Sequence, residues 1–252
     1  MVFQTREYFA GIWVIGALKM INMKNNYLVL LLLVFSSTLF SQSNAKEKLK
    51  TKLVYSDDFN LDLSNWNVEF EKPETSSLKI IDGKLDVSTS IGATIWFKTQ
   101  LSGNIMITYD VKIIDEGGAF DRVSDLNAFW MATDPSNPDS IKRDGKFASY
   151  DNLNLYYAGV GGHYNKFTRF RKYKGIDDKP VLKEYSDKEH LLVGNKWYSV
   201  KIMVNNGHIQ YFLNGELYWD FQDDKPYKQG FFGFRTSKSH QLFDNFKVFE
   251  IE

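Results

Sequence analysis

The feature that most constrains this chain is a period-two alternation of polar and apolar residues that begins near Leu53 and continues to the end. Its apolar positions are rich in β-branched and aromatic side chains, a pattern that is typical of strands with one buried face. The runs 77–81 and 84–88 are separated by Asp82-Gly83, a strong turn signal for a hairpin. No stretch after Leu53 has a convincing helical period, so the sequence predicts an all-β fold.

Further strands are expected wherever the alternation returns between turn residues. They cover residues 93–99, 104–114, 198–204, 208–213, 216–221, 230–236 and 242–251. Roughly twelve strands in about 200 residues predict two packed antiparallel sheets, an antiparallel β-sandwich that forms a single domain. The runs 54–59 and 243–249 are expected to pair, and the stretch 115–150 is expected to form long loops.

Residues 1–45 are interpreted as an upstream extension followed by a signal peptide. The apolar run 27–40 is shorter than the roughly 20 residues of a membrane span but suits the core of a signal peptide. Met23 resembles a natural start; an uncleaved N-terminal anchor is the alternative. Residues 46–252 are then expected to form a single catalytic domain, periplasmic or secreted, with no membrane partner after cleavage.

Composition excludes several classes of function. The chain has no cysteine, which excludes a disulfide scaffold, a thiolate zinc site and a cysteine nucleophile. Its 31 basic and 31 acidic residues argue against a nucleic-acid partner, because nucleic-acid-binding surfaces are normally basic. Aromatic residues make up 16% of the chain, which is enough to fill a large core or a binding face.

The block 154–175 carries most of the chemistry-bearing residues, with no acid over 163–175. Residues i and i+2 of a strand share a face, so Arg169, Arg171 and Tyr173 are expected to point the same way. Two adjacent guanidinium groups would form a receptor for a carboxylate or sulfate. The alternative is a solvated edge strand whose bases discourage aggregation.

His163 is the first candidate for proton chemistry, because it lies where the glycine-rich segment meets the basic strand, beside Tyr164. A structural histidine is the alternative. His240 is the second candidate. Arg235 alternates with phenylalanines, which predicts that it lies on the sheet surface away from the core.

Four more candidates lie in or beside the long-loop region: Asn127, Trp130, Arg143 and Tyr150. An exposed Trp130 would stack on a sugar, although a buried tryptophan is the commoner outcome. No metal site is predicted, because the paired acids at 57–58 and 223–224 lack the spacing of a calcium loop. A structural Ca²⁺ near the termini stays an open alternative.

Two blocks of the sequence, 147–175 and 225–248, resemble a known family. Within them the chain reads YYAGVGGHYNKFTRFRKY at 156–173 and PYKQGFFGFRTSKSHQLFDNFKV at 226–248. These motifs resemble a domain of unknown function in secreted concanavalin/laminin-G-like jelly-roll proteins, found with polysaccharide lyases. Some members are similar to uronate lyase-type enzymes of marine bacteria, including a dehydratase that acts on ulvan oligosaccharides.

The resemblance implies a concanavalin A-like jelly roll with carbon–oxygen lyase activity on uronic-acid oligosaccharides or polysaccharides. The residues of the block suit such an elimination: His163 and a tyrosine, Tyr157 or Tyr164, would exchange protons, while Arg169 and Arg171 would hold a carboxylate or sulfate. A lyase and a dehydratase need the same protein groups, so both stay open. No cofactor is expected, and the protein is expected to be a monomer.

Arg235 and His240 would close the same site. Two other functions stay open beside the lyase. A non-catalytic carbohydrate-binding jelly roll would use Trp130 and the tyrosines as stacking platforms. A glycoside hydrolase would need a suitably spaced pair of carboxyl groups, and the acids at 110–116 have the wrong spacing for one.

Overall fold

The turn residues close the hairpins at the positions that the sequence predicts. In the computed structural model, which describes residues 49–252, β3 (Ser76–Ile81) and β4 (Lys84–Thr89) flank a turn whose residues have φ values of 50° and 67°. Both positive φ values are those that a type I′ turn requires. The predicted leader over residues 1–45 lies outside the described residues.

One sheet, which we call sheet A, contains three consecutive antiparallel strands over residues 197–222 and both ends of the described chain. Its strand order is β14 (Glu216–Gln222), β13 (His208–Leu213), β12 (Trp197–Asn205), β7 (Ile105–Ile113), β16 (Ser239–Ile251), β4 and β3. β1 (Thr51–Asp57) pairs with β16, placing Tyr55 opposite Val248 and Asp57 opposite Phe246. The predicted pairing of the two terminal runs is therefore confirmed.

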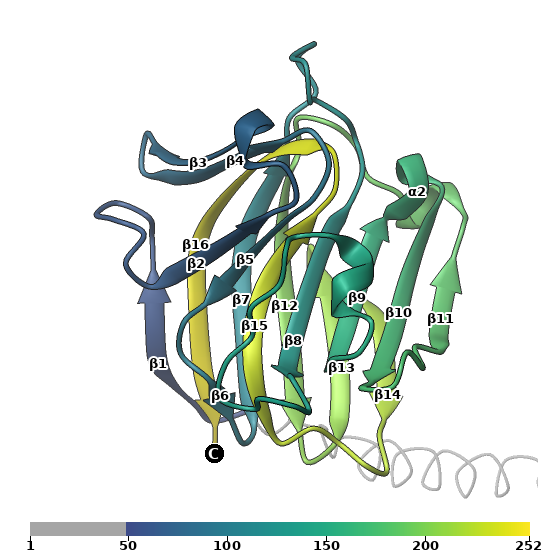
Figure 1. Ribbon diagram of the computed structural model, residues 1–252. Helices are drawn as coiled ribbons and strands as arrows, with labels where there is room; N and C mark the ends of the chain where they lie inside the picture. Colours follow the sequence, from purple (N-terminus) through teal and green to yellow (C-terminus); the bar gives the residue numbers. More distant parts are fainter. Residues whose placement is uncertain (1–48) are drawn as a thin grey trace, which may run out of the picture. The chain divides into compact units, whose positions relative to one another are not determined.

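The second sheet, sheet B, carries the block 154–175 on two neighbouring strands, next to the strand at one edge. Its strand order is β11 (Val181–Tyr185), β10 (Phe167–Lys174), β9 (Asn154–Gly161), β8 (Leu126–Thr133), β15 (Gln229–Thr236), β5 (Ala93–Phe97) and β2 (Trp66–Phe70), and β6 (Leu101–Ser102) pairs with β15. Within residues 49–252, two antiparallel eight-stranded sheets thus form the predicted all-β sandwich (Figure 1).

β8 corrects the prediction that 115–150 consists of loops. All its residues from Leu126 to Ala132 are buried, so it lacks the polar alternation that marks a half-exposed strand. The helical pieces of the described chain are short. They are η1 (Pro73–Thr75), η2 (Phe147–Tyr150), α2 (Gly162–Asn165) and η3 (Lys188–His190). Within residues 49–252, no helix is long and apolar enough to span a membrane.

Two hydrophobic clusters lie on opposite faces of sheet B. The larger one fills the space between the sheets and includes Trp130, whose ring stacks on Phe170 at 5.9 Å between centroids. The smaller one lies on the outer face of sheet B, under the segment 134–153 that crosses this face between β8 and β9 (Figure 1). It contains Trp96, Phe129, Ala132, Tyr150, Leu153, Leu155, Tyr157 and Tyr173.

Candidate functional site

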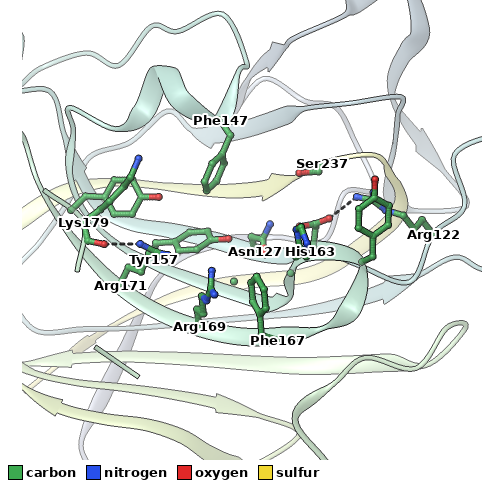
Figure 2. Close-up of a pocket in the computed structure, with 15 residues that line it drawn as sticks. Arg122, Asn127, Phe147, Tyr157, His163, Phe167, Arg169, Arg171, Lys179 and Ser237 are labelled. Carbon is green, nitrogen blue, oxygen red and sulfur yellow. Dashed lines mark hydrogen bonds and ion pairs between the residues drawn. The ribbon is translucent and has the colours of Figure 1, made fainter. Parts of the chain in front are cut away.

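A pocket of about 410 Å³ opens on the outer face of sheet B, over β8, β9 and β10. Six of the residues that were singled out in the sequence line it: Asn127, Tyr157, His163, Tyr164, Arg169 and Arg171. Figure 2 shows Asn127 between the hydroxyl end of Tyr157 and His163, with Phe147 above them and Arg169 below. The fold therefore brings most of the proposed catalytic residues into one pocket.

Strand alternation on β10 explains the basic wall of this pocket. Arg169, Arg171 and Tyr173 all face the pocket, while Phe170 between them packs into the core between the sheets. The predicted sharing of one face by residues two apart is confirmed. The glycine-rich end of β9 lies beside this wall, with Arg169 opposite Gly159 and Arg171 opposite Tyr157 in the strand register.

The two arginines differ in their partners. Arg169 forms an ion pair with Glu184 on β11, and its guanidinium lies 3.5 Å from the centroid of the Phe167 ring. Arg171 donates a hydrogen bond from Nη1 to the Lys179 carbonyl at 2.7 Å and forms no ion pair within residues 49–252. The base-only stretch is therefore partly neutralised by the neighbouring strand, and Arg171 keeps the guanidinium that is open to an anion.

Tyr157 lies flat along β9 because the residue two positions later is glycine. A Cβ added at Gly159 would clash with the Tyr157 hydroxyl oxygen. The Tyr157 side chain is only 8% exposed, and its ring packs against Phe147 at 5.6 Å. Burial raises the pKa of the Tyr157 hydroxyl well above its usual value, with further contributions from Tyr173 and Asp125. The group is therefore a protonated phenol at neutral pH and acts as a hydrogen-bond or proton donor.

Asn127 provides a neutral amide at the floor of the pocket. It lies on β8 between Gly159 on one side and Arg235 on the other, and it is 3% exposed. Its side-chain oxygen is buried without a hydrogen-bond partner within residues 49–252. A buried polar atom without a partner costs about 1–3 kcal/mol, so a water molecule or a ligand group that reached this oxygen would add a favourable hydrogen bond.

His163 and Tyr164 reach the pocket from a left-handed turn at the end of β9. The φ values of Gly161, His163, Tyr164 and Asn165 are 66°, 52°, 64° and 59°. The left-handed conformation costs an L-residue roughly 1–2 kcal/mol, and such strain is concentrated at functional sites. Asn165 holds the turn through two hydrogen bonds with the Leu192 backbone, at 2.8 and 2.9 Å.

The two rings on this turn occupy different surroundings. The His163 ring stacks in parallel on Phe167, with 5.7 Å between centroids. Tyr164 is 66% exposed, and the Arg122 guanidinium lies 4.8 Å from its ring centroid. Tyr157 is thus a buried phenol of the pocket, as is Tyr173, whereas Tyr164 forms part of its rim.

Three of the other expected site residues hold the segment 134–153 in place and do not line the pocket. Arg235 faces away from the core phenylalanines, as predicted, but it is 1% exposed and donates to the Gly145 carbonyl at 2.7 Å. Tyr150 is fully buried and donates its hydroxyl to Glu69 at 2.7 Å. Arg143 pairs with Asp134 at 2.7 Å.

Two expected binding residues lie elsewhere. Trp130 is completely buried between the sheets, which corrects its expected role as a sugar-stacking platform: strand alternation turns it inward and Phe129 outward. His240 does not line the pocket. It lies between Asp86 and Asp121, with nitrogen–oxygen distances of 2.9 and 3.1 Å.

Several residues that line the pocket had not been singled out in the sequence, and three of them come from segments between the strands. Phe147 lies on η2, Lys179 on the connection between β10 and β11, and Arg122 on the connection between β7 and β8. None of them stands in an alternating pattern, so strand periodicity gave no signal. Phe147 is, however, the first residue of one of the two blocks that carry the family resemblance.

No group of three or more histidine and acidic side chains within residues 49–252 is arranged to hold a metal ion. Each of the two paired acid runs, 57–58 and 223–224, contains a side chain with protein partners. Asp57 accepts a hydrogen bond from the Trp66 indole at 2.9 Å, and Asp223 accepts from Tyr156 and pairs with Lys172.

Comparison with solved structures identifies the fold. A protein of unknown function with a galectin-like fold from Bacillus subtilis superposes with a TM-score of 0.64 at 18% identity, over 81% of this chain and all of that one. The carbohydrate-binding module CBM66 from Bacillus subtilis gives 0.52 at 17% identity, over 73% and 94%. The endo-β-1,3-glucanase from Pyrococcus furiosus gives 0.55 at 11% identity, over 82% and 97%.

Comparison with sequences identifies the family. No curated protein matches this sequence. Residues 87–246 match the model of a family described as a domain of unknown function, DUF6250. The matched segment includes both blocks on which the resemblance rested, apart from the last two residues of the second. This chain, with its jelly-roll sandwich and a pocket on the outer face of one sheet, therefore belongs to the DUF6250 family.

Proposed function

We propose that this protein binds an anionic oligosaccharide of the uronic-acid class in the pocket on the outer face of sheet B. The observation that carries this proposal is the guanidinium of Arg171, which has no carboxylate partner within residues 49–252 and shares the pocket with the Asn127 amide and the Tyr157 phenol. A guanidinium matches a carboxylate as a planar two-point donor. The amide and the phenol add neutral groups that suit sugar hydroxyls.

The surroundings of these three groups support a sugar rather than a small inorganic anion. Phe147, 36% exposed, and Tyr164, 66% exposed, both line the pocket and leave part of their rings open to a ligand. An exposed aromatic ring beside polar groups is suited to stack on the apolar face of a sugar ring, whose hydroxyl groups then stay in contact with water or polar side chains. The carbohydrate-binding module and the glucanase share the fold, although a fold by itself does not determine a function.

Titration calorimetry with a panel of oligosaccharides tests this function. The panel contains oligomers of galacturonate, of glucuronate and of mannuronate, with neutral gluco-oligosaccharides for comparison. Arg171→Gln is expected to weaken uronate binding by about 1.5–3 kcal/mol, or about 10- to 150-fold, because the substitution removes a charged hydrogen-bonding group. Lys52→Gln, a change of the same charge at an exposed position on β1, is the matched control and should leave binding unchanged. Equal binding of acidic and neutral oligomers would contradict the proposal.

A second candidate function is β-elimination in the same pocket, and the grouping of His163, Asn127 and Tyr157 favours it (Figure 2). His163 takes the proton from C5 of the uronate, and the C5–H electrons form the double bond to C4. The bond from C4 to its oxygen breaks, and Tyr157, whose raised pKa keeps it protonated, gives the leaving oxygen its proton. Asn127, which Figure 2 shows beside His163, stabilises the charge that develops on the carboxylate, and Arg171 holds another carboxylate of the oligosaccharide at the other end of the pocket.

Absorbance of the unsaturated uronate and mass spectrometry of the products test this second function. Cleavage to unsaturated fragments identifies a lyase, and loss of one water from an intact oligosaccharide identifies a dehydratase. His163→Ala should abolish the product while leaving oligosaccharide affinity within about threefold, because the ring contributes to the chemistry more than to the charge of the pocket. Tight uronate binding without any product would leave binding as the function and exclude elimination.

Either activity suits a protein that meets polysaccharide fragments outside the cytoplasm, and the predicted signal peptide over residues 1–45 supports export. Fractionation of cells that produce the full chain tests this part of the proposal. Recovery of the protein in the periplasm or medium, with the N-terminus near residue 46, is the expected result. Retention of the complete chain in the cytoplasm would contradict it.

A further inference from the structure

We infer that the pocket receives the end of an acidic oligosaccharide chain and not a segment from the interior of a polymer. The inference rests on the proposed function and adds the part of the ligand that is recognised. It follows from the way in which the chain covers the outer face of its own sheet B (Figure 1). An open sheet face would let a long polymer lie across all the strands.

The outer face of sheet B is largely closed to a ligand. Trp96 on β5, Phe129 on β8 and Leu155 on β9 project from this face, and each is at most 3% exposed. Tyr150 and Leu153 from the segment 134–153 pack on them and are completely buried. Aromatic side chains that could form a long sugar platform are therefore part of a second hydrophobic cluster.

The covering segment is firmly attached to the sheet. Glu69 on β2 accepts hydrogen bonds from the Trp96 indole at 2.8 Å and from the Tyr150 hydroxyl at 2.7 Å, and it also accepts one from the backbone of Arg143. Gly145, at a φ of 80°, lies so close to the backbone of β2 that an added Cβ would clash with Glu71. Because these contacts lie just before η2 and at its last residue, the segment forms a fixed wall above the pocket.

The end of the pocket near Tyr173 is closed as well. Lys179, on the connection between β10 and β11, forms an ion pair with Asp151 of the covering segment. The backbone of Gly175 donates to the Leu153 carbonyl at 3.0 Å, so the same two segments are also joined through the main chain. Arg171 donates to the Lys179 carbonyl from inside this corner.

The closed corner and the exposed rim define a direction for the ligand. Arg171 and Lys179 lie at the closed side, and Figure 2 shows them at the opposite end of the pocket from His163 and Arg122. The carboxylate of a terminal uronate fits beside Arg171, and the rest of the chain leaves past the exposed ring of Tyr164. A chain that continued in both directions would collide with the wall formed by Lys179 and Asp151.

The amount of protein that a fixed mass of polymer binds distinguishes chain-end binding from interior binding. The probes are glucuronan, polygalacturonate and polymannuronate, each as long chains and as the same material partly shortened, with the full-length protein in excess. Chain-end binding predicts that a treatment that doubles the number of chains doubles the amount of bound protein. Interior binding predicts an unchanged capacity, which would overturn the inference while leaving the proposed function intact.

The variant Arg171→Gln shows whether the ends bind in this pocket. It should lose the increase in bound protein that shortening produces, whereas the control Lys52→Gln should retain it. An increase that persists in Arg171→Gln would place chain-end binding elsewhere and overturn the inference. Failure of the wild-type protein to bind any of the three polymers or their fragments would count against the proposed function itself.

Discussion

The two faces of sheet B use neighbouring residues of one strand for different purposes, as Tyr156 and Tyr157 of β9 show. Tyr156 points between the sheets, where its ring stacks on Trp130 and its hydroxyl donates to Asp223 at 2.5 Å. Tyr157 points outward and lines the pocket. Burial raises the pKa of both phenols. On the inner face the hydroxyl serves the fold, whereas on the outer face it is available to a ligand.

The same contrast extends to the basic residues of β10. Lys172 on the inner side pairs with Asp223 at 2.7 Å and donates to the Lys225 carbonyl at 2.7 Å. Arg171, one residue earlier, faces the pocket without a carboxylate partner within residues 49–252. A residue's contribution to stability or to binding is therefore set by the face on which it lies rather than by its chemical type.

The largest expected effect is on the inner face. Trp130→Ala should lower the free energy of unfolding by about 3–5 kcal/mol, because it removes a large side chain that is fully enclosed between the sheets. Tyr164→Ala, at the exposed rim, should change it by no more than about 0.5 kcal/mol. Urea denaturation of both variants measures the difference. Similar losses in the two variants would contradict the contrast between the faces.

The neighbouring tyrosines give the most direct comparison. Tyr156→Phe should destabilise the protein by about 1.5–3 kcal/mol, since it removes a hydrogen bond to the charged Asp223. Tyr157→Phe should leave stability nearly unchanged and should weaken uronate binding or abolish elimination. The two variants differ from the wild type by one oxygen atom each, so denaturation and calorimetry on the pair separate the two roles. A reversal of the two results would sink the assignment of Tyr157 to the site.

Substitution of Asn127 should change the free energy of unfolding and the affinity for uronate in opposite directions. Asn127→Leu has a similar shape and removes the buried amide oxygen that has no partner, so the free energy of unfolding should rise by up to about 1 kcal/mol. Uronate affinity should fall at the same time, because the ligand loses a neutral polar partner. A variant that loses both stability and affinity would instead show that the amide supports the fold.

The smallest effect concerns His240, which lies outside the pocket. The hydrogen bond to Asp86 raises the pKa of His240, with Asp121 adding to the effect and burial opposing it. The pKa of His240 is higher in the folded protein than in the unfolded chain. The contribution of His240 to the free energy of unfolding is therefore complete below about pH 6 and is lost as the pH rises through the folded-state pKa. Denaturation of wild type and His240→Gln between pH 5 and about 9 should show this decline only in the wild type. The same decline in His240→Gln would assign it to another group.

Strand periodicity predicted the sandwich because, in strands with one exposed face, polar and apolar residues alternate along the sequence. It missed β8, whose residues are buried on both faces, by the segment 134–153 on one side and by the core on the other. That covering depends on contacts between residues far apart, such as Tyr150 with Glu69, and local patterns carry no information about them. The burial of Trp130 depends instead on contacts between the two sheets, such as the one with Tyr211 on β13.

The basic face of the site was predictable and its electrostatics were not. The spacing of Arg169 and Arg171 places both guanidinium groups in the pocket, as the structure shows. Which guanidinium group lacks a carboxylate partner depends on the register between β10 and β11, where Glu184 lies opposite Arg169 and pairs with it. Phe147 and Lys179 reach the pocket from connections, whose course is fixed only by tertiary contacts.

In the left-handed turn at 161–165, the side chains that line the pocket are present at the expense of thermal stability. Glycine adopts positive φ without the steric cost that histidine and tyrosine incur, so replacing His163 or Tyr164 by glycine relieves strain. A library of variants screened only for heat resistance would therefore enrich glycine at these two positions. The enriched variants would have removed the imidazole and the rim phenol from the pocket. Directed evolution of this scaffold thus requires a selection for ligand recognition alongside the selection for heat resistance.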